Sequence, residues 1–237
     1  MKPKLVGLYM AAGSSRRMGE PKLSLDVLNG AKLGGIALMT ALRSELDHVI
    51  VVVSGEREGK GKGEGEDKDK DKDKDTNKDK GGRPDWIPVA ALPHIRSGRC
   101  RIEVSADSHL GMAHSLRTGL EAAEGLAADG VLILLADQPL VDAAMIHRLI
   151  EKFVSEPGLD YAASCDQGTP KPPVLLGKRM FGAIAMLQGD IGARTLFQTS
   201  SYRGVHIDNS VAEHFVDIDT PEDYEAFKRN RCICNEI

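Results

Sequence analysis

The chain lacks the long apolar segment that a membrane span requires and the excess of basic charge that favours nucleic-acid binding. None of its apolar runs approaches the ~20 residues needed to cross a bilayer, and the formal net charge of the 237 residues is −4. The segment from Gly13 to Lys22 is polar and basic, where a secretory signal needs a longer apolar core and a cleavage site. We therefore expect a cytoplasmic protein that binds neither nucleic acid nor membrane.

Cysteine and histidine are too sparse and too scattered to form a recognisable metal centre. Of the four cysteines, only Cys232 and Cys234 lie close together in the sequence. That spacing matches no zinc or iron–sulfur pattern, and the seven histidines form no spaced cluster. A redox or metal role for the thiols stays open, but isolated reduced cysteines suit a cytoplasmic protein better.

Apolar residues make up 41% of the chain and occur in runs that alternate with helical patterns. The predicted strands are residues 5–10, 49–53, 101–105, 131–136, 160–164, 173–176, 205–207 and 215–218. The predicted helices are residues 32–46, 112–126, 141–153 and 178–187, and a last one that begins with Thr220 as N-cap and Pro221 in the first turn. This alternation predicts one α/β domain over residues 1–237, with three layers and a mostly parallel, Rossmann-like central sheet.

One segment does not fit the alternation. Between Lys60 and Lys80, eight lysines and eight acidic residues are mixed only with Gly, Asn and Thr. Nothing there can be buried, so ordering the segment would cost backbone entropy without a compensating contact. We predict a disordered surface insertion at about residues 57–83, although alternating charges could also suit a helix or a tail that binds a metal or a partner.

The segment after the first predicted strand combines small residues with basic ones. Residues 10–22 read Met-Ala-Ala-Gly-Ser-Ser-Arg-Arg-Met-Gly-Glu-Pro-Lys. Small side chains let backbone N–H groups approach phosphate oxygens, and Arg17 and Lys22 can add charge-assisted contacts. The segment is neither a Walker loop nor the Gly-x-Gly-x-x-Gly dinucleotide fingerprint. It predicts a phosphate-binding loop, and the alternative is an ordinary glycine-rich turn with surface arginines.

A carboxylate follows the most apolar of the predicted strands. Asp137 comes directly after residues 131–136, and ligands of open α/β sheets bind at the carboxyl ends of the strands. Mg²⁺ prefers one or two protein carboxylates together with phosphate oxygens and waters. Asp137 is therefore a candidate metal ligand, unless it only starts the turn before Pro139.

Residues 10–22 resemble the signature of the MobA-like nucleotidyltransferases, Leu-Ala-Ala-Gly-x-Ser-x-Arg-Met-Gly-x-x-Lys, with Met10 where the family has Leu. Two further family motifs, Asp-x-Pro and Asp-Thr-Pro-Glu-Asp, are matched at residues 137–139 and 219–223. The resemblance implies a GT-A-like nucleotidyltransferase fold. It implies catalytic roles for Arg17, Lys22 and Asp137, and Mg²⁺ ligation by Asp137 and Asp219, with Asp217 as an alternative second ligand. The residues that it assigns to the nucleotide are Ala11, Ala12, Gly13, Ser15, Arg17, Lys22, Gly111 and Ser115.

Two more segments resemble the molybdenum cofactor cytidylyltransferase branch of that family. They are Gly111-Met112-Ala113-His114-Ser115-Leu116 and Gly189-Asp190-Ile191-Gly192-Ala193-Arg194. The branch pattern implies that Lys171, Asp190 and Arg194 bind the acceptor, although Lys171-Pro172-Pro173 stands where the branch has Gly-His-Pro. The pair Ala11-Ala12 is similar to the cytidine-using branch, whereas guanosine-using members have Ala-Gly-Gly.

The implied activity is Mg²⁺-dependent transfer of CMP from CTP to molybdopterin or molybdenum cofactor, with release of pyrophosphate. The product would be the cytosine dinucleotide cofactor of a molybdenum hydroxylase such as xanthine dehydrogenase. Two enzymatic alternatives stay open, namely the use of GTP and a sugar phosphate as acceptor. A non-catalytic carrier that binds the cofactor and delivers it is the alternative outside the enzymes.

Overall fold

The computed structural model describes residues 2–13, 15, 17–27, 30–55, 83–189, 196–197, 201–208 and 211–234. The predicted insertion at residues 57–83 lies outside the described residues except for Arg83. Two of the predicted acceptor-binding residues, Asp190 and Arg194, lie outside them as well.

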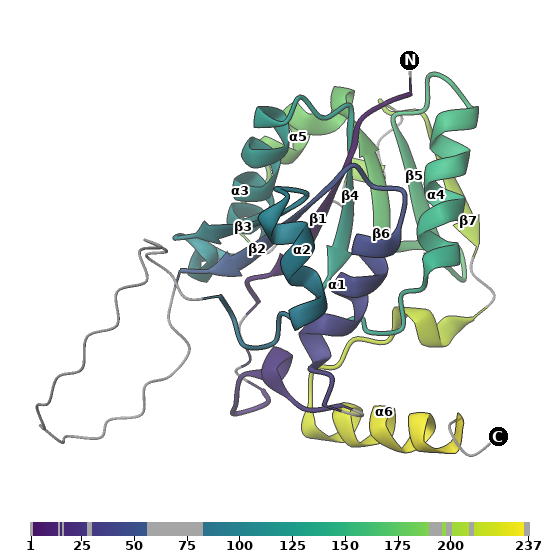
Figure 1. Ribbon diagram of the computed structural model, residues 1–237. Helices are drawn as coiled ribbons and strands as arrows, with labels where there is room; N and C mark the ends of the chain where they lie inside the picture. Colours follow the sequence, from purple (N-terminus) through teal and green to yellow (C-terminus); the bar gives the residue numbers. More distant parts are fainter. Residues whose placement is uncertain are drawn as a thin grey trace, which may run out of the picture.

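The described residues form one seven-stranded sheet in the order β3-β2-β1-β4-β6-β5-β7 (Figure 1). The strands are β1 (Leu5–Ala11), β2 (His48–Ser54), β3 (Cys100–Ser105), β4 (Gly130–Leu135), β5 (Tyr161–Asp166), β6 (Thr169–Gly177) and β7 (Gly204–Asp208). β1 pairs in parallel with both β2 and β4, β2 with β3, and β5 with β7. Only β6, between β4 and β5, runs antiparallel to its neighbours. The predicted mostly parallel sheet is confirmed.

Helices cover both faces of this sheet and complete the three predicted layers (Figure 1). α1 (Leu33–Arg43) and α4 (Ala143–Ser155) pack on one face, with the short α2 (Leu92–Arg96) beside α1. α3 (Met112–Gly125) and α5 (Phe181–Ala185) pack on the other. β1 is apolar throughout because both of its faces are buried. Leu5 and Tyr9 join the core under α1 and α4, whereas Val6 and Leu8 join the core under α3.

The parallel register places the carboxyl ends of β1, β2, β3 and β4 along one edge of the sheet. The antiparallel β6 begins near the same edge, because Val174 pairs with Ile133 and the first residues of β6 extend past the end of β4. The glycine-rich loop, Asp137 and Lys171 therefore belong to one edge, where ligands of such sheets bind.

In the second half of the chain one predicted element is shorter than expected and another was wrong. Within the predicted helix over residues 178–187, a 3₁₀ turn, Lys178–Met180, leads directly into the five-residue α5, which ends at Ala185. The predicted closing strand at residues 215–218 is instead the end of a 3₁₀ turn, Ala212–Phe215, followed by a stretch without regular structure. Phe215 and Ile218 are both buried, so their apolar character came from packing over the strand ends and not from pairing in the sheet.

The last helix, α6 (Pro221–Cys234), begins as predicted and lies below the sheet in Figure 1. Its start is a reciprocal cap, in which the Asp223 N–H donates to Thr220 Oγ1 at 3.2 Å and the Thr220 N–H donates to Asp223 Oδ2 at 2.9 Å. Thr220 Oγ1 also donates to Asp223 Oδ2, at 2.8 Å. Phe227 of α6 packs with Val27, Leu33 and Ile218 in a small separate core.

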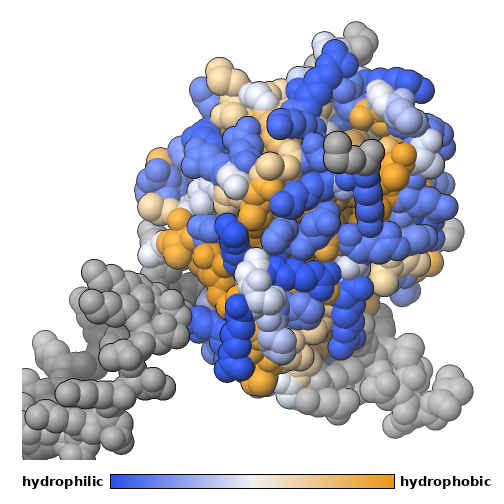
Figure 2. Space-filling model, turned by 45° about the horizontal axis from the view of Figure 1, so that its top comes forward, coloured by the Kyte–Doolittle hydropathy of each residue, from blue (hydrophilic) through white to orange (hydrophobic). Residues whose placement is uncertain are grey.

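The described surface includes several exposed large apolar residues, among them Val89, Leu110 and Met186. The face in Figure 2 is mostly hydrophilic, with small apolar areas between charged side chains. Within the described part of the chain, no helix has the length and apolar character needed to cross a membrane.

Candidate active site

The loop after β1 folds back so that Lys22 returns to the sheet edge. The Met18 N–H donates to the Ser15 carbonyl at 3.1 Å, and the Lys22 N–H donates to Ser15 Oγ at 3.0 Å. Gly13 is exposed, and apart from its chain neighbours no described residue comes within 4 Å of the position that a Cβ would take there. The loop thus leaves open space beside its backbone, as an anion-binding turn requires. The hydroxyl oxygen of Ser15 accepts a hydrogen bond from the loop itself, so its predicted contact with the nucleotide stays a prediction.

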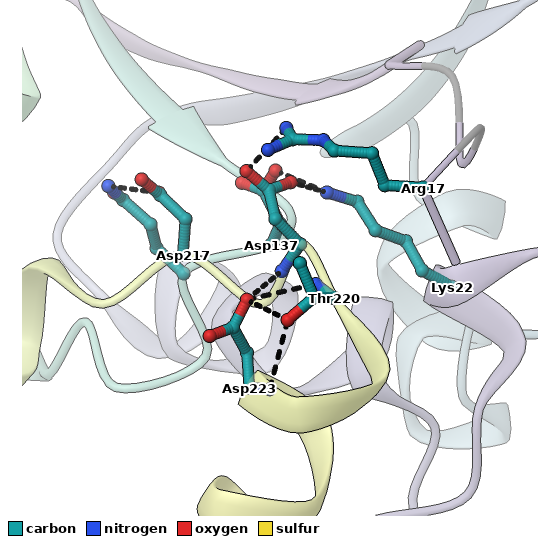
Figure 3. Close-up of polar contacts among 8 residues, drawn as sticks. Arg17, Lys22, Asp137, Asp217, Thr220 and Asp223 are labelled. Carbon is teal, nitrogen blue, oxygen red and sulfur yellow. Dashed lines mark hydrogen bonds and ion pairs between the residues drawn. The ribbon is translucent and has the colours of Figure 1, made fainter.

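Lys22 joins two carboxylates from distant parts of the chain (Figure 3). It is 6% exposed, and its ammonium donates to Asp137 Oδ2 at 2.7 Å and to Asp219 Oδ1 at 2.8 Å. Burial alone would lower the pKa of Lys22, but the charges and hydrogen bonds of the two carboxylates outweigh burial and raise it. Lys22 is therefore a fixed cation between the two residues that were predicted to hold a metal.

Arg17 adds a second cation to the same cluster. Its Nη2 donates to Asp219 Oδ2 at 2.7 Å, while most of its side chain is exposed. Burial would raise the pKa of Asp219, but Lys22 and Arg17 together hold it below its usual value. The three predicted catalytic residues and both predicted metal ligands are thus brought together at one point.

The segment that carries Asp219 is fastened to the end of β4 by two further bonds. The Ile218 N–H donates to the Asp137 carbonyl at 2.9 Å, and Gln138 Nε2 donates to Asp217 Oδ1 at 2.9 Å. Gln138 is buried, and its Oε1 has no hydrogen-bond partner among the described residues. Burial and the nearby Asp137 charge raise the pKa of Asp217. The sequence signalled Gln138 only as the middle residue of Asp-x-Pro, so its contact with Asp217 was missed.

The chemistry of this donor set decides whether a metal fits. In the described parts of the chain, no group of three or more His, Cys, Asp or Glu is arranged to hold a metal ion. Asp137 and Asp219 nevertheless converge on one cation, the Lys22 ammonium. Two carboxylates, supplemented by phosphate oxygens and waters, are the ligands that Mg²⁺ prefers. The residues present therefore fit a Mg²⁺ that takes its remaining ligands from a bound nucleotide.

The Gly-Met-x-x-Ser-Leu motif lies at the start of α3, which follows β3 at the same sheet edge. Gly111 caps this helix with φ of 120°, a conformation that side chains other than glycine rarely adopt, and Ser115 is buried in the first turns. The Ala113 N–H donates to the Gly189 carbonyl at 3.0 Å, which brings the Gly189 turn to the helix start. In the described residues, the hydrogen bonds and ion pairs of the Lys22 cluster include neither Gly111 nor Ser115.

Lys171, the described member of the predicted acceptor set, lies near the start of β6. Its ammonium donates to Asp166 Oδ2 at 2.6 Å and lies 5.5 Å from the centre of the Phe215 ring. Asp166 and Lys171 belong to the β5–β6 hairpin, so this ion pair is local. A contact between Lys171 and an acceptor stays a prediction.

Comparisons with known proteins bear on the family and the fold of the chain. Residues 7–205 match a family described as "MobA-like NTP transferase domain". The chain is 33% identical over 230 residues to the purine catabolism protein PucB of Bacillus subtilis, and the aligned region covers 96% of this chain and 97% of PucB. Among solved structures, a homologue of Mycobacterium tuberculosis Rv0371c from Mycobacterium sp. strain JC1 superposes with a TM-score of 0.69 at 24% identity. The superposition covers 99% of this chain and 100% of the homologue's chain. Rv0371c of Mycobacterium tuberculosis in complex with manganese has a TM-score of 0.63 at 21% identity, over 95% and 98% of the two chains.

Proposed function

This chain belongs to the MobA-like NTP transferase family, and from that membership we propose that it transfers CMP from CTP to molybdopterin or molybdenum cofactor in a Mg²⁺-dependent reaction. It is a nucleotidyltransferase. The proposed product is the cytosine dinucleotide cofactor, and pyrophosphate is the leaving group. The proposed site of action is the cytoplasm, and the proposed recipient of the product is a molybdenum hydroxylase such as xanthine dehydrogenase.

The observation that carries this proposal is the cluster of Lys22, Asp137 and Asp219 at the carboxyl edge of the sheet. Attack of an acceptor phosphate on the α-phosphorus of a nucleotide brings several anions together. Catalysis of that step consists mainly of positioning the reactants and stabilising their charge. Lys22 is cationic and held in place, and Arg17 is cationic and reachable from solvent. In the proposed reaction both would bind the triphosphate and neutralise pyrophosphate as it leaves.

Asp137 and Asp219 are the residues that would hold the metal. When bound, Mg²⁺ supplies Lewis-acid stabilisation of the charge on the phosphoryl oxygens. The structure of Rv0371c, a neighbour in fold, is a manganese complex, and this supports a divalent cation in the proposed reaction. Ala11, Ala12, Gly13, Ser15, Gly111 and Ser115 remain the proposed nucleotide contacts, and Lys171, Asp190 and Arg194 the proposed acceptor contacts.

Two features support the proposed choice of base and acceptor. The methyl group of Ala12 would occupy space that a purine base needs, a steric preference worth about 1–3 kcal/mol. The relative at 33% identity is named a purine catabolism protein. Xanthine is a purine, so an enzyme that completes the cofactor of a xanthine-oxidising hydroxylase would belong to the same process.

The test is to incubate the purified protein with CTP, Mg²⁺ and molybdenum cofactor, and to measure the cytosine dinucleotide by mass spectrometry and pyrophosphate by a coupled assay. We expect both products, and their loss when a chelator removes the metal. Turnover with GTP alone would assign the protein to the guanylyl branch, and turnover only with sugar phosphates would overturn the acceptor. Delivery of cofactor to a hydroxylase without consumption of nucleotide would indicate a carrier.

A further inference from the structure

Trp86, the one tryptophan of the chain, packs beside the turn that carries Lys22. It belongs to the first described segment after the predicted insertion, and it is 6% exposed. Its ring lies 6.2 Å from that of Tyr9 on β1, and both rings belong to the core that includes Leu23. Leu23 directly follows Lys22 in the 3₁₀ turn Lys22–Ser24. Trp86 is thus part of the packing beneath a proposed catalytic residue.

The contact between these elements depends on Gly34 at the start of α1. A Cβ on Gly34 would lie 2.8 and 2.9 Å from two atoms of the Trp86 ring and 3.0 Å from Leu23 Cβ. Because Gly34 has no side chain, both the indole ring of Trp86 and the side chain of Leu23 can pack directly against the backbone of α1 at this position. At Gly35, a Cβ would lie 3.0 Å from the Trp86 carbonyl oxygen. The glycine pair, which lowers helix propensity in the sequence, makes room for Trp86.

One hydrogen bond holds the same turn, and a second holds the start of α1 beside it. Ser24 Oγ donates to Asp85 Oδ1 at 2.5 Å, so the residue before Trp86 is tied to the end of the Lys22–Ser24 turn. Tyr9 Oη donates to the Gly34 carbonyl at 2.7 Å, which ties β1 to the helix start. The Lys22 turn is therefore enclosed between β1, α1 and the Asp85–Trp86 segment.

We propose that Trp86 is a positioning residue for nucleotidyl transfer, which acts by fixing the turn that places the Lys22 ammonium against the triphosphate. This inference rests on the proposed function, because it needs Lys22 to meet the nucleotide. The lysine stem is flexible, so the position of its ammonium depends on a backbone that cannot shift. Misplacement of a catalytic group by about 1 Å can cost ~100-fold in rate.

A double-mutant cycle tests the proposal. Trp86→Ala is expected to lower kcat/KM for CTP by up to ~100-fold when Lys22 is present. In a Lys22→Ala background the same change should cause no further loss, because residues that act through one another are not additive. Trp86→Phe, which keeps an aromatic ring, should restore part of the activity. An equal loss from Trp86→Ala in both backgrounds would show a purely structural role and overturn the proposal.

Phe153→Leu is the matched control for lost core packing. The Phe153 ring lies against Gly130 and Gly177, on strands and not on the Lys22 turn. We expect it to lower the melting temperature without changing kcat/KM. If Trp86→Ala does not fold, Trp86→Phe and Asp85→Ala take its place in the cycle. Unchanged kcat/KM in both of those variants would equally overturn the proposal.

Calorimetric titration of the wild-type protein with CTP and Mg²⁺ separates the two possible failures. Binding is expected, accompanied by a change in tryptophan fluorescence that reports on Trp86 alone. No binding by the wild-type protein would overturn the proposed function and the inference with it. If the wild-type protein binds CTP, but Trp86→Ala lowers kcat/KM equally in the wild-type and Lys22→Ala backgrounds, only the proposed role of Trp86 is overturned.

Discussion

Two lysines at the same sheet edge differ in how their partners are brought to them. Lys22 pairs with Asp137 and Asp219, which are 115 and 197 positions away in the sequence, and 8% of its side chain is exposed. Lys171 pairs with Asp166, five positions away in the same hairpin, and 39% of its side chain is exposed. The fold has to bring distant segments together to form the ion pairs of Lys22, whereas the ion pair of Lys171 forms within one β-hairpin. The comparison indicates that the edge has a preorganised side, suited to stabilising charge, and a more adaptable side at the hairpin.

The largest effect is expected from Asp137→Ala on the preorganised side. Removal of a carboxylate that would hold the metal should lower turnover by several orders of magnitude, because charge stabilisation in the transition state is lost. Release of pyrophosphate under saturating CTP measures it. Asp166→Ala, which removes a carboxylate from the hairpin side, is the matched control and should retain most of the activity. Comparable losses in the two variants would contradict the division of the edge.

Lys22→Met should lower kcat by about 10²–10³-fold, the usual cost of removing one preorganised charge-stabilising donor. It also leaves Asp137 and Asp219 without the cation between them, so the melting temperature in the absence of nucleotide should fall. Calorimetry and single-turnover kinetics measure the two effects. A variant with wild-type kcat would show that the buried ion pairs of Lys22 serve only the fold.

Lys171→Met on the hairpin side should act on the acceptor alone. We expect KM for the acceptor to rise about tenfold, the size of one hydrogen bond to a charged group, while KM for CTP stays unchanged. Steady-state kinetics with each substrate varied in turn separate the two constants. A rise in KM for CTP instead would assign Lys171 to the nucleotide.

The smallest effect is expected from replacing residues 60–80 by a short Gly-Ser linker. Loop length contributes little to stability, so kcat/KM and the melting temperature should stay close to the wild-type values. The linker keeps Asp85 and Trp86, which isolates the insertion from the contacts of the Lys22 turn. A tenfold loss of activity would show that the charged segment takes part in the reaction.

The central strands and the main site residues could be predicted because local patterns report them directly. Runs such as Leu5–Ala11 are apolar because both faces are covered, and the parallel pairing of β1 with β4 then brings the glycine-rich loop and Asp137 to one edge. That Asp219 lies beside Asp137 followed only from the family resemblance, since nothing local in the sequence relates positions so far apart, and the contact of both carboxylates with Lys22 was not predicted.

Other features depend on tertiary contacts that leave no local signal. The apolar residues Phe215 and Ile218 predicted a strand, because apolar residues in such a short segment are typical of pairing in a sheet. They are instead buried by packing over the strand ends. Gly34 lowers helix propensity, and only the structure shows that its missing side chain makes room for Trp86. Gln138 stood inside a matched motif, but its bond to Asp217 depends on where the chain returns 79 positions later.

The cap of α6 does more than begin a helix. Asp223 Oδ2, which accepts from Thr220, also accepts from the Asp219 N–H at 3.2 Å, and Thr220 holds the pKa of Asp223 below its usual value. The most peripheral helix in Figure 1 therefore anchors the main chain of the residue that meets both Lys22 and Arg17. Fraying of that helix would loosen the Asp219 carboxylate at the edge of the sheet, so the stability of α6 and the geometry of the proposed site are coupled.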